Sequence, residues 1–412
     1  MGIVGIAQLK IGMVLADDVR DVNGRLLLAK GEEIQTQHVR ILKTWGIAEV
    51  KISGEAEPED SASAPIDAEK LEKEQADTEF IFSHIDRNHP AVKILYDLCV
   101  LYRCHHNGNV ADVDLRAAPP DSSTIEKIRQ DVIERIRQNE IKLPEIPVIV
   151  SELNEVIANP YTSAKHIAEV VYKSPSLTTL LLKIVNSPLY GFPQKIDRVS
   201  HAVTLIGTQE ISSLALGITI LSVFKDLPED IIDMRSFLKH SLACGIIARI
   251  LAAQKNWPQT EQLFVSGLLH DIGRLILYVY FQSQARNLLA HAIKSNTILY
   301  QEEKNILGCQ HTDIAKYLLK KWQIPSNIEN NVSYHHHPSN AKNPEQAAVV
   351  HTADIIVNGL GIGTSGERFV PPLDNDAWNR LGLSPSCFET AIQLATHQLS
   401  SLDLFLENLQ PT

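Results

Sequence analysis

The sequence contains little cysteine and has no excess of positive charge. Its five cysteines are scattered without a Cys-x-x-Cys pair, which argues against a disulfide framework and fits a reducing cytosol. Lysine and arginine total 38 against 49 aspartates and glutamates, so the net charge is −11. A general nucleic-acid-binding surface needs clustered positive charge. We therefore expect no nucleic-acid partner.

The sequence also lacks the patterns of a signal peptide and of a membrane span. Lys10 and Asp17 interrupt the N-terminal apolar residues, which excludes the basic-then-apolar signal pattern. The longest uncharged apolar-rich run, at 211–224, is too short to cross a bilayer. We expect a soluble cytoplasmic protein without a membrane span, whose contact with any membrane would come through a partner. At 412 residues it can hold two or three domains.

The N-terminal part, residues 1–53, predicts a small β-rich (α+β) domain. Asn23-Gly24 is a hairpin-turn signal, and Leu26-Leu27-Leu28 forms the expected return strand. Residues 36–45 predict one short helix, and residues 49–52 a closing strand. The next segment, 54–77, is rich in Glu, Asp and Ser, which predicts an acidic flexible linker.

Helical periodicity dominates the remainder of the chain. Residues 78–140 predict a helical connector with amphipathic helices at 91–102 and 125–138. Apolar residues at spacings of three and four, punctuated by prolines, predict an all-α domain over 141–366. Residues 367–412 predict a C-terminal helical extension with a helix at 388–409. The expected fold class is mainly α, a multi-helix bundle behind a small N-terminal β-rich domain.

The adjacent pair His270 and Asp271 lies in an apolar stretch, 264–280, that predicts a helix. An ionised carboxylate in an apolar interior needs a partner or a metal ion. Further imidazole and carboxylate side chains occur in or beside apolar helical segments, at His240, His311, His335, His336 and Asp354. Each one alone is explained as a core histidine or a buried cap. The ordered set instead favours one or two divalent transition-metal ions, iron or manganese first, with zinc or nickel as alternatives.

Several sequence blocks carry a family resemblance. They are Leu143-Pro144-Glu145-Ile146-Pro147, Asn186-Ser187-Pro188, Thr204-Leu205-Ile206-Gly207, Leu269-His270-Asp271-Ile272-Gly273, Tyr334-His335-His336-His337-Pro338 and Val350-His351-Thr352-Ala353-Asp354. On these blocks, residues 143–366 resemble an HD-related output domain (HDOD), a helical branch of the HD metal-dependent phosphohydrolase superfamily. Residues 1–53 are more weakly similar to a small β-containing segment found ahead of some HD-type signalling proteins.

The resemblance implies an HD-type bundle and a bacterial signalling role, with response-regulator, sensor or cyclic-dinucleotide modules as partners. His240, His270, Asp271 and Asp354 match the basic HD ligand set. The remaining three, His311, His335 and His336, match the extra ligands of the HD-GYP branch, which hydrolyses cyclic di-GMP. In that branch Asp271 would bridge two ions.

Two departures from that branch weaken the expectation of cyclic di-GMP cleavage. No Gly-Tyr-Pro follows the His335-His336 pair, and the usual lysine after His-Asp-Ile-Gly is Arg274. An arginine there can grip phosphate through its planar fork, or it can be an ordinary solvated helix residue. Both interpretations of Arg274 stay open at the sequence level.

Other conspicuous groups receive structural interpretations. Cys99, Cys104, His105 and His106 lack a matching second half for a zinc site. His337 and His351 neighbour the ligand set, which predicts supporting or exposed roles. Gly361, Gly363 and Gly366 lack the strand-loop-helix context of a phosphate loop, which predicts a helix-exit loop.

Two functions remain as hypotheses. The first is a signalling and interaction module with a structural or regulatory metal, and we favour it because the Gly-Tyr-Pro motif is missing. The second is a metal-dependent phosphohydrolase or phosphodiesterase acting on a nucleotide or cyclic dinucleotide, which the intact ligand series favours. The helices at 91–102 and 125–138 are candidates for partner docking or for a homo-oligomer contact.

Overall fold

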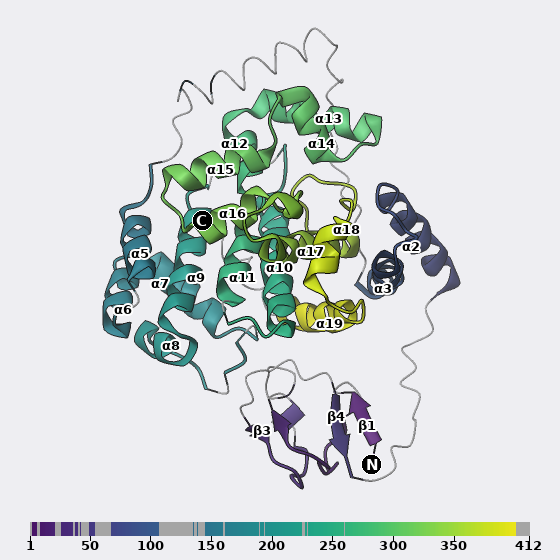
Figure 1. The fold of residues 1–412 in the computed structure, drawn as a ribbon, viewed down its shortest axis with the longest axis vertical. Coiled ribbons are helices and arrows are strands. Elements are labelled where there is room, and N and C mark those ends of the chain that lie inside the picture. Colours follow the sequence, from purple (N-terminus) through teal and green to yellow (C-terminus); the bar gives the residue numbers. More distant parts are fainter. Residues whose placement is uncertain are drawn as a thin grey trace.

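A computed structural model describes residues 2–5, 9–20, 26–35, 38–39, 42, 49–53, 67–106, 135, 138 and 145–400, without 160, 189, 193, 225–226, 229 and 259 in the last range. Within these residues the chain is mainly α-helical, with short strands near the N-terminus (Figure 1). The predicted fold class is therefore confirmed.

The N-terminal unit contains two small antiparallel sheets. Strand β1 (Gly2–Gly5) pairs with β4 (Glu49–Ile52), and β2 (Val19–Arg20) pairs with β3 (Leu26–Leu28). The apolar side chains of this unit form their own core, separate from that of the helical body, and include Val4, Leu15, Leu28, Ile34, Leu42, Val50 and Ile52. The predicted Asn-Gly turn and most of the predicted 36–45 helix lie outside the described residues.

The predicted linker, 54–77, is wrong for residues 68–77, because helix α2 (Ala68–Ile81) begins at Ala68, and residues 54–66 lie outside the described residues. Asp67 caps this helix by accepting a hydrogen bond from the Glu69 N–H. Packing against α3 (Pro90–His106) stabilises this helix. The buried Glu74 of α2 accepts a hydrogen bond from Arg103 Nε of α3 at 3.1 Å. Residues 68–77 are therefore helical and carry a buried ion pair.

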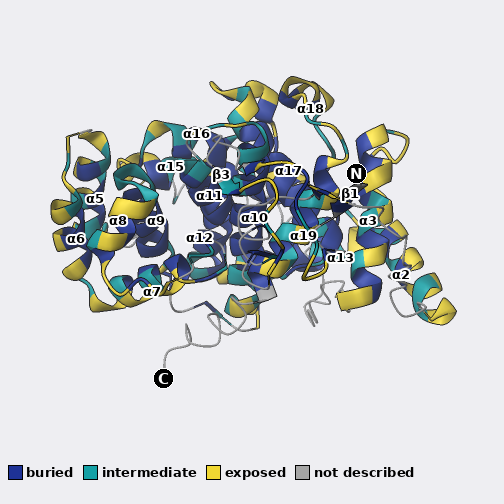
Figure 2. Ribbon diagram, turned by 90° about the horizontal axis from the view of Figure 1, so that it is seen from below, coloured by how far each residue is buried: buried dark blue, intermediate teal, exposed yellow. Residues whose placement is uncertain are grey.

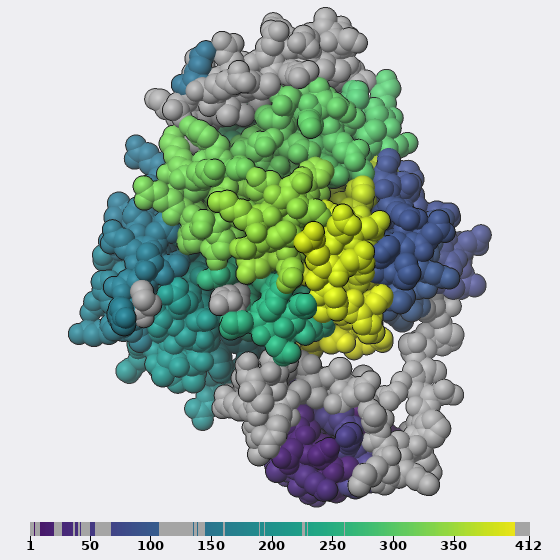
Figure 3. Space-filling view, viewed as in Figure 1, coloured from purple at the N-terminus to yellow at the C-terminus, as the bar shows by residue number. Residues whose placement is uncertain are grey.

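Helices α2 and α3 belong to the main body of the protein. Helix α3 contains the predicted 91–102 helix and contacts both α17 (Pro344–Leu360) and α19 (Cys387–Ser400). The space-filling view shows α2 and α3 in blue beside the yellow C-terminal helices (Figure 3). The predicted 125–138 helix lies outside the described residues apart from Arg135 and Gln138, as does the predicted 388–409 helix beyond Ser400.

The main body begins with five peripheral helices that pack on one another. They are α5 (Val148–Ala158), α6 (Ala164–Tyr172), α7 (Pro175–Val185), α8 (Val199–Ile206) and α9 (Thr208–Leu221). Ser163 and Ser174 cap α6 and α7, because each hydroxyl accepts a backbone N–H of the first turn. Of these helices, α9 is the most buried, and it packs against α11 (Thr260–Leu269).

Helices α10 (Met234–Gln254), α11 and α17 form the centre of the molecule, where most residues are buried (Figure 2). Around them lie the remaining described elements. They are α12 (Ile272–Tyr280), α13 (Gln282–Ser295), α14 (Leu299–Leu307), α15 (His311–Lys321), α16 (Ser326–Ser333), the 3₁₀ helix η2 (Pro338–Asn340) and α18 (Asn375–Leu381).

Two glycines let α10 and α11 approach each other closely. A Cβ at Gly267 would lie 2.7 Å from the Cys244 carbonyl oxygen, and a Cβ at Gly245 would lie 2.7 Å from that of Phe264. Real Cβ atoms do not approach backbone this closely, so only glycine permits this helix contact. The contact brings His240 of α10 beside His270, which follows α11.

By length and composition alone, two segments of the described residues are long and apolar enough to cross a membrane. They are Met234–Gln254 and Thr260–Tyr280, each with a mean hydropathy of 1.3. However, 72% and 89% of the residues in these two apolar windows are buried inside the structure. Burial of this kind is expected of core helices, whose apolar residues face other helices.

Candidate metal centre

The structure brings all seven predicted ligands together in two adjoining groups of side chains. The first cluster contains His240, Cys244, His270 and Asp354, and the second cluster contains Asp271, His311, His335 and His336. Within each cluster, one donor atom from every residue lies within 4.8 Å of the others. All eight side chains are buried, and His336 has the largest exposed fraction at 6%. The sequence prediction of a converging set is thus matched by the geometry, with Cys244 added to it.

The ligands come from helices that are distant in sequence. Helix α10 contributes His240, α17 contributes Asp354, and α15 begins with His311. His335 and His336 follow the end of α16 in a turn, outside any regular helix.

The His270–Asp271 pair lies at a break in the predicted 264–280 helix. Helix α11 ends at Leu269, Asp271 is the N-cap residue of α12, and its φ and ψ of −98° and 14° depart from helical values. The prediction of one continuous helix over 264–280 is therefore wrong. The break is useful because it lets His270 turn toward the first cluster while Asp271 lies between both clusters.

Gly273 positions the second cluster. A Cβ at this position would overlap the His311 carbonyl oxygen and lie 3.1 Å from the Ala315 nitrogen. The backbone of α15 therefore passes directly over the first turn of α12. This approach places His311 Nε2 3.0 Å from Asp271 Oδ1.

We expect Gly273→Ala to lower the free energy of unfolding by about 3 kcal/mol, because the new methyl group must push two helix backbones apart. Denaturant unfolding measures this loss. Gly217→Ala is the matched control, since its Cβ would meet only side-chain atoms of Val265 and Leu268 at 3.1–3.3 Å. Equal losses for the two variants would contradict the close approach of α15 to α12.

The donor atoms of the first cluster are spaced like ligands of a single ion. His240 Nε2 lies 3.3 Å from His270 Nε2 and 3.3 Å from Asp354 Oδ1. His270 Nε2 lies 3.5 Å from the same Asp354 oxygen. Two ligands bound about 2.1 Å from one ion are about 3.0 Å apart in octahedral and about 3.4 Å apart in tetrahedral coordination. The observed spacing therefore fits a first-row metal ion.

Hydrogen bonds on the far side of three imidazoles fix their tautomers. The Nδ1 atoms of His270 and His335 donate to the carbonyl oxygens of Gly267 and Val332, at 2.7 and 2.8 Å. His311 Nδ1 donates to Glu303 at 2.6 Å. When the ring is neutral, each Nε2 therefore presents a lone pair to the cluster, the arrangement found when a second residue orients a metal-binding histidine.

Two ring nitrogens whose lone pairs face each other are stabilised by a cation or a proton between them. His311 Nε2 and His335 Nε2 are 3.5 Å apart, and both Nδ1 protons are already committed elsewhere. His336 has no hydrogen-bond partner on either ring nitrogen, although the residue is buried and its ring stacks on Tyr300. Buried unpaired nitrogens carry a large desolvation cost. A metal ion bound by this donor set would remove that cost, so the residues present fit the metal that the sequence predicted.

Asp271 connects the two clusters. Its Oδ2 atom lies 3.1 Å from His270 Nε2, and its Oδ1 atom lies 3.0 Å from His311 Nε2. Burial alone would raise the pKa of Asp271, but Arg274 and the neighbouring imidazoles hold it well below its usual value. The carboxylate is therefore ionised and can face one ion with each oxygen.

The charges of the site favour a cation at its centre. Burial would raise the pKa of Asp354, but hydrogen bonds from His240 and His270 hold it well below its usual value. Burial would lower the pKa of His270, but Asp271 and Asp354 raise it to about 10. Burial, reinforced by the neighbouring histidines, lowers the pKa of His335 and His336 well below the usual value, so both rings stay neutral and able to bind metal.

Arg274 is buried, so its interpretation as a solvated helix residue is wrong. Its guanidinium donates to Asp271 Oδ2 at 3.2 Å, to Glu303 at 3.1 Å and to Ser365 Oγ at 2.6 Å. The Glu367 carboxylate lies 3.8 Å from Nη2. Arg274 thus holds the bridging aspartate in place, and its contact with phosphate stays a prediction.

Sequence analysis missed three residues of this site. Cys244 follows His240 by one helical turn, and this spacing is the signal that could have revealed it. Glu303 binds both His311 Nδ1 and Arg274, but it lies in a charged helix segment that gives no sign of burial. Glu367 accepts the backbone N–H groups of Leu299, Arg368 and Phe369, and burial raises its pKa to about 7.

The neighbouring motifs mostly take the supporting roles expected of them. His351 Nδ1 donates to the His335 carbonyl oxygen at 2.7 Å and so braces that ligand. Gly361 is the left-handed C-cap residue of α17, as a helix-exit loop requires. Cys99 and Cys104 are buried in α3, and neither belongs to a possible metal cluster among the described residues.

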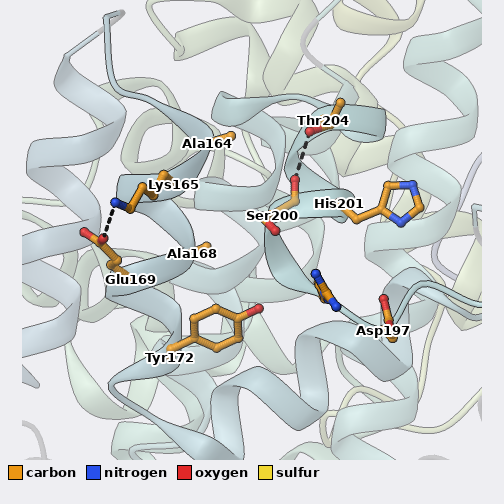
Figure 4. A pocket seen from close by; sticks show the side chains of 10 residues that line it. Ala164, Lys165, Ala168, Glu169, Tyr172, Asp197, Ser200, His201 and Thr204 are labelled. Atoms are coloured by element: carbon orange, nitrogen blue, oxygen red, sulfur yellow. Dashed lines mark hydrogen bonds and ion pairs between the residues drawn. The ribbon is translucent and has the colours of Figure 1, made fainter.

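A separate pocket of about 830 Å³ opens on the surface between α6 and α8 (Figure 4). Its lining includes Lys165 and Tyr172 from α6 and His201 from α8, together with Arg198 just before α8. None of the eight cluster residues lines this pocket. The candidate metal centre is therefore an enclosed site, distinct from this surface pocket.

Comparison with known proteins finds one matching protein family and several structures with a similar fold. The family described as "HDOD domain" matches residues 143–338. A curated relative, an uncharacterized protein from Treponema pallidum (strain Nichols), is 22% identical over 205 residues. That alignment covers 50% of this chain and 39% of the relative, so the chain spans well under half of the relative's length.

Solved structures share the fold at low sequence identity. An HDOD domain protein of unknown function from Geobacter sulfurreducens matches with a TM-score of 0.52 and 19% identity, covering 69% of this chain and 97% of that one. A protein provisionally described as a phosphohydrolase, from Shewanella amazonensis SB2B, matches with a TM-score of 0.53 and 19% identity, covering 67% and 97%. A protein provisionally described as a signal transduction protein, from Marinobacter aquaeolei VT8, matches at 0.52 and 19%, covering 73% and 68%.

Proposed function

Because residues 143–338 match the HDOD domain family, we propose that the chain is an output module of bacterial signal transduction. Two divalent metal ions bound inside the bundle would stabilise the helix arrangement that binds the partner protein. The ligands would be His240, His270, Asp271, His311, His335, His336 and Asp354. The proposal concerns the described helical body, and the partner proteins remain those that the sequence predicts: response-regulator, sensor or cyclic-dinucleotide modules.

The observation that carries this proposal is the burial of the whole ligand set. His240, His270, His311 and His335 have no exposed surface, and Asp271 has 2%. A hydrolase must admit a phosphate ester to its metal ions. Arg274, the candidate phosphate contact, is turned inward onto carboxylates. An enclosed centre of this kind supports a structural or regulatory metal better than an open catalytic one.

The second candidate function is metal-dependent hydrolysis of a phosphate ester or cyclic dinucleotide. The position of Asp271 favours it, because one carboxylate faces both clusters, as in two-metal hydrolases. Bound ions of this type lower the pKa of a coordinated water and polarise a phosphoryl oxygen. This chain's residues would hold the ions, while Glu303 orients the His311 imidazole and His351 braces the backbone of His335. Access of substrate would require His336, which is buried and stacks on Tyr300, to become exposed.

The experiment that separates the two functions is elemental analysis followed by an activity screen on the same sample. Purified protein is loaded with Fe²⁺, Mn²⁺ or Zn²⁺, and nucleotides and cyclic dinucleotides are offered as substrates. Bound metal without turnover is the expected result. Turnover that disappears in His270→Ala would instead establish the hydrolase, and protein that binds no metal would contradict both functions.

A docking surface for a partner protein also has candidates in the structure. Ile94 and Leu101 of α3 are 40% and 47% exposed, and their spacing of seven residues places them on one helix face. Tyr172 and Leu205, on α6 and α8, are each 48% exposed. Exposed apolar side chains favour contact with another protein, so a signalling partner or a homo-oligomer stays a prediction.

A further inference from the structure

Cys244 lies inside the candidate metal centre. It follows His240 by four residues on α10, so both side chains project from the same helix face. Its sulfur atom is 3.7 Å from His240 Nε2, and the residue has no exposed surface. The sulfur also lies within 4.8 Å of the donor atoms of His270 and Asp354.

The spacing of these donors matches a tetrahedral site with one sulfur ligand. A nitrogen about 2.05 Å and a thiolate sulfur about 2.3 Å from a tetrahedral ion are about 3.6 Å apart. The observed separation between Cys244 Sγ and His240 Nε2 is 3.7 Å. The three separations among His240, His270 and Asp354 are 3.3, 3.3 and 3.5 Å, close to the tetrahedral value of about 3.4 Å for nitrogen and oxygen ligands.

Packing alone does not account for this position. Cys99 and Cys387 are also buried on helices, but neither belongs to a candidate metal cluster among the described residues. Cys244 is the cysteine there that combines a helix-face partner, His240, with a nearby carboxylate, Asp354. His240 Nε2 lies near the Cys244 sulfur, and His240 Nδ1, on the opposite side of the ring, has no hydrogen-bond partner. The orientation of the His240 ring is therefore not set by a hydrogen bond at Nδ1.

We propose that Cys244 is a thiolate ligand of the first metal ion, which makes the two metal positions chemically unequal. On binding, the sulfur–metal bond replaces the S–H bond, and the proton passes to solvent. The first position, with two nitrogens, one sulfur and one oxygen each from Asp354 and the bridging Asp271, would select Zn²⁺, because thiolate ligands favour softer ions. The second position has only nitrogen and oxygen donors and accepts Mn²⁺ or Fe²⁺. This inference rests on the proposed metal centre and names the ion preference within it.

The test uses Co²⁺ as a coloured probe in the full-length chain. Co²⁺ bound to a thiolate absorbs in the near ultraviolet, whereas Co²⁺ bound only to nitrogen and oxygen lacks this charge-transfer band. We expect the band in the unmodified protein and its loss in Cys244→Ser. The control, Cys387→Ser, should retain it, since Cys387 is a buried thiol of α19 outside both clusters. We also expect Cys244→Ser to lower Zn²⁺ affinity on the order of 100-fold while leaving the Mn²⁺ affinity of the second position nearly unchanged.

Each outcome decides the proposal. Stoichiometric Co²⁺ without the thiolate band would overturn the role of Cys244 and leave the metal centre intact. Absence of any bound Co²⁺ would overturn the centre and the Cys244 proposal together. If Cys244→Ser does not fold, X-ray absorption of the zinc-loaded unmodified protein replaces it. One sulfur about 2.3 Å from zinc supports the proposal, and a shell of nitrogen and oxygen alone contradicts it.

Discussion

Asp271→Asn is expected to remove both metal ions from the purified protein. Its two carboxylate oxygens lie 3.1 Å from His270 Nε2 and 3.0 Å from His311 Nε2, so one side chain faces both clusters. The amide keeps the shape but supplies a single neutral oxygen and an N–H₂ group that repels a cation. Elemental analysis should show the metal content falling from about two ions per chain to well below one.

Three further substitutions sharpen this prediction. Asp354→Asn should remove only the ion of the first cluster, and His336→Ala should weaken only the second. Asp374→Asn is the control, because this carboxylate caps α18 and bonds Ser339 without belonging to either cluster. If Asp271→Asn and Asp374→Asn retained equal amounts of metal, the bridging role of Asp271 would be excluded.

Arg274→Met is expected to lower the free energy of unfolding by about 3–5 kcal/mol, the range measured when one partner of a buried ion pair is removed. The guanidinium is buried and lies within 4.0 Å of the carboxylates of Asp271, Glu303 and Glu367. Methionine fills much of the same volume but leaves these three groups without their cation. Denaturant unfolding of protein with matched metal content measures the loss.

The control for this prediction is Arg286→Met. Arg286 pairs with Asp230 at 2.7 Å, a shorter contact than any Arg274 ion pair. However, the side chains of Arg286 and Asp230 are 32% and 64% exposed. Exposed ion pairs contribute little, so we expect a loss below about 1 kcal/mol. If Arg274→Met lowered the free energy of unfolding by a similarly small amount, the buried carboxylates would not require the Arg274 guanidinium for stability.

The ligand set could be predicted from the sequence because it conflicts with its surroundings. His240, His270 and Asp354 occupy segments that are otherwise apolar, where an ionisable side chain is costly unless it has a partner. The same periodicity gave the mainly helical fold, since apolar residues recur at helical spacing from residue 78 onward.

The local backbone of the site could not be predicted in this way. The break between α11 and α12 falls within a continuous apolar stretch, and residues 268–272 contain no proline or glycine that would indicate it. It follows from tertiary contacts, chiefly the passage of α15 over Gly273. A backbone break that depends on contact with a helix distant in sequence leaves no pattern in the residues around it.

Cys244 was missed, and the burial of Arg274 could not be decided, for a related reason. A cysteine in an apolar helix resembles an ordinary core residue, and an arginine near a helix start resembles a solvated one. Their roles depend on Asp354, Glu303 and Glu367, which come from other elements. Helix α2 was missed because its acidic composition resembles a linker, whereas burial of Glu74 against Arg103 keeps it on the body.

Anomalous X-ray diffraction from crystals of the metal-loaded protein tests the central claim most directly. We predict two peaks about 3.5–4 Å apart, one among His240, Cys244, His270 and Asp354 and the other among His311, His335 and His336, with Asp271 between them. A fully loaded protein whose peaks lay elsewhere, with no density among these side chains, would contradict the metal centre.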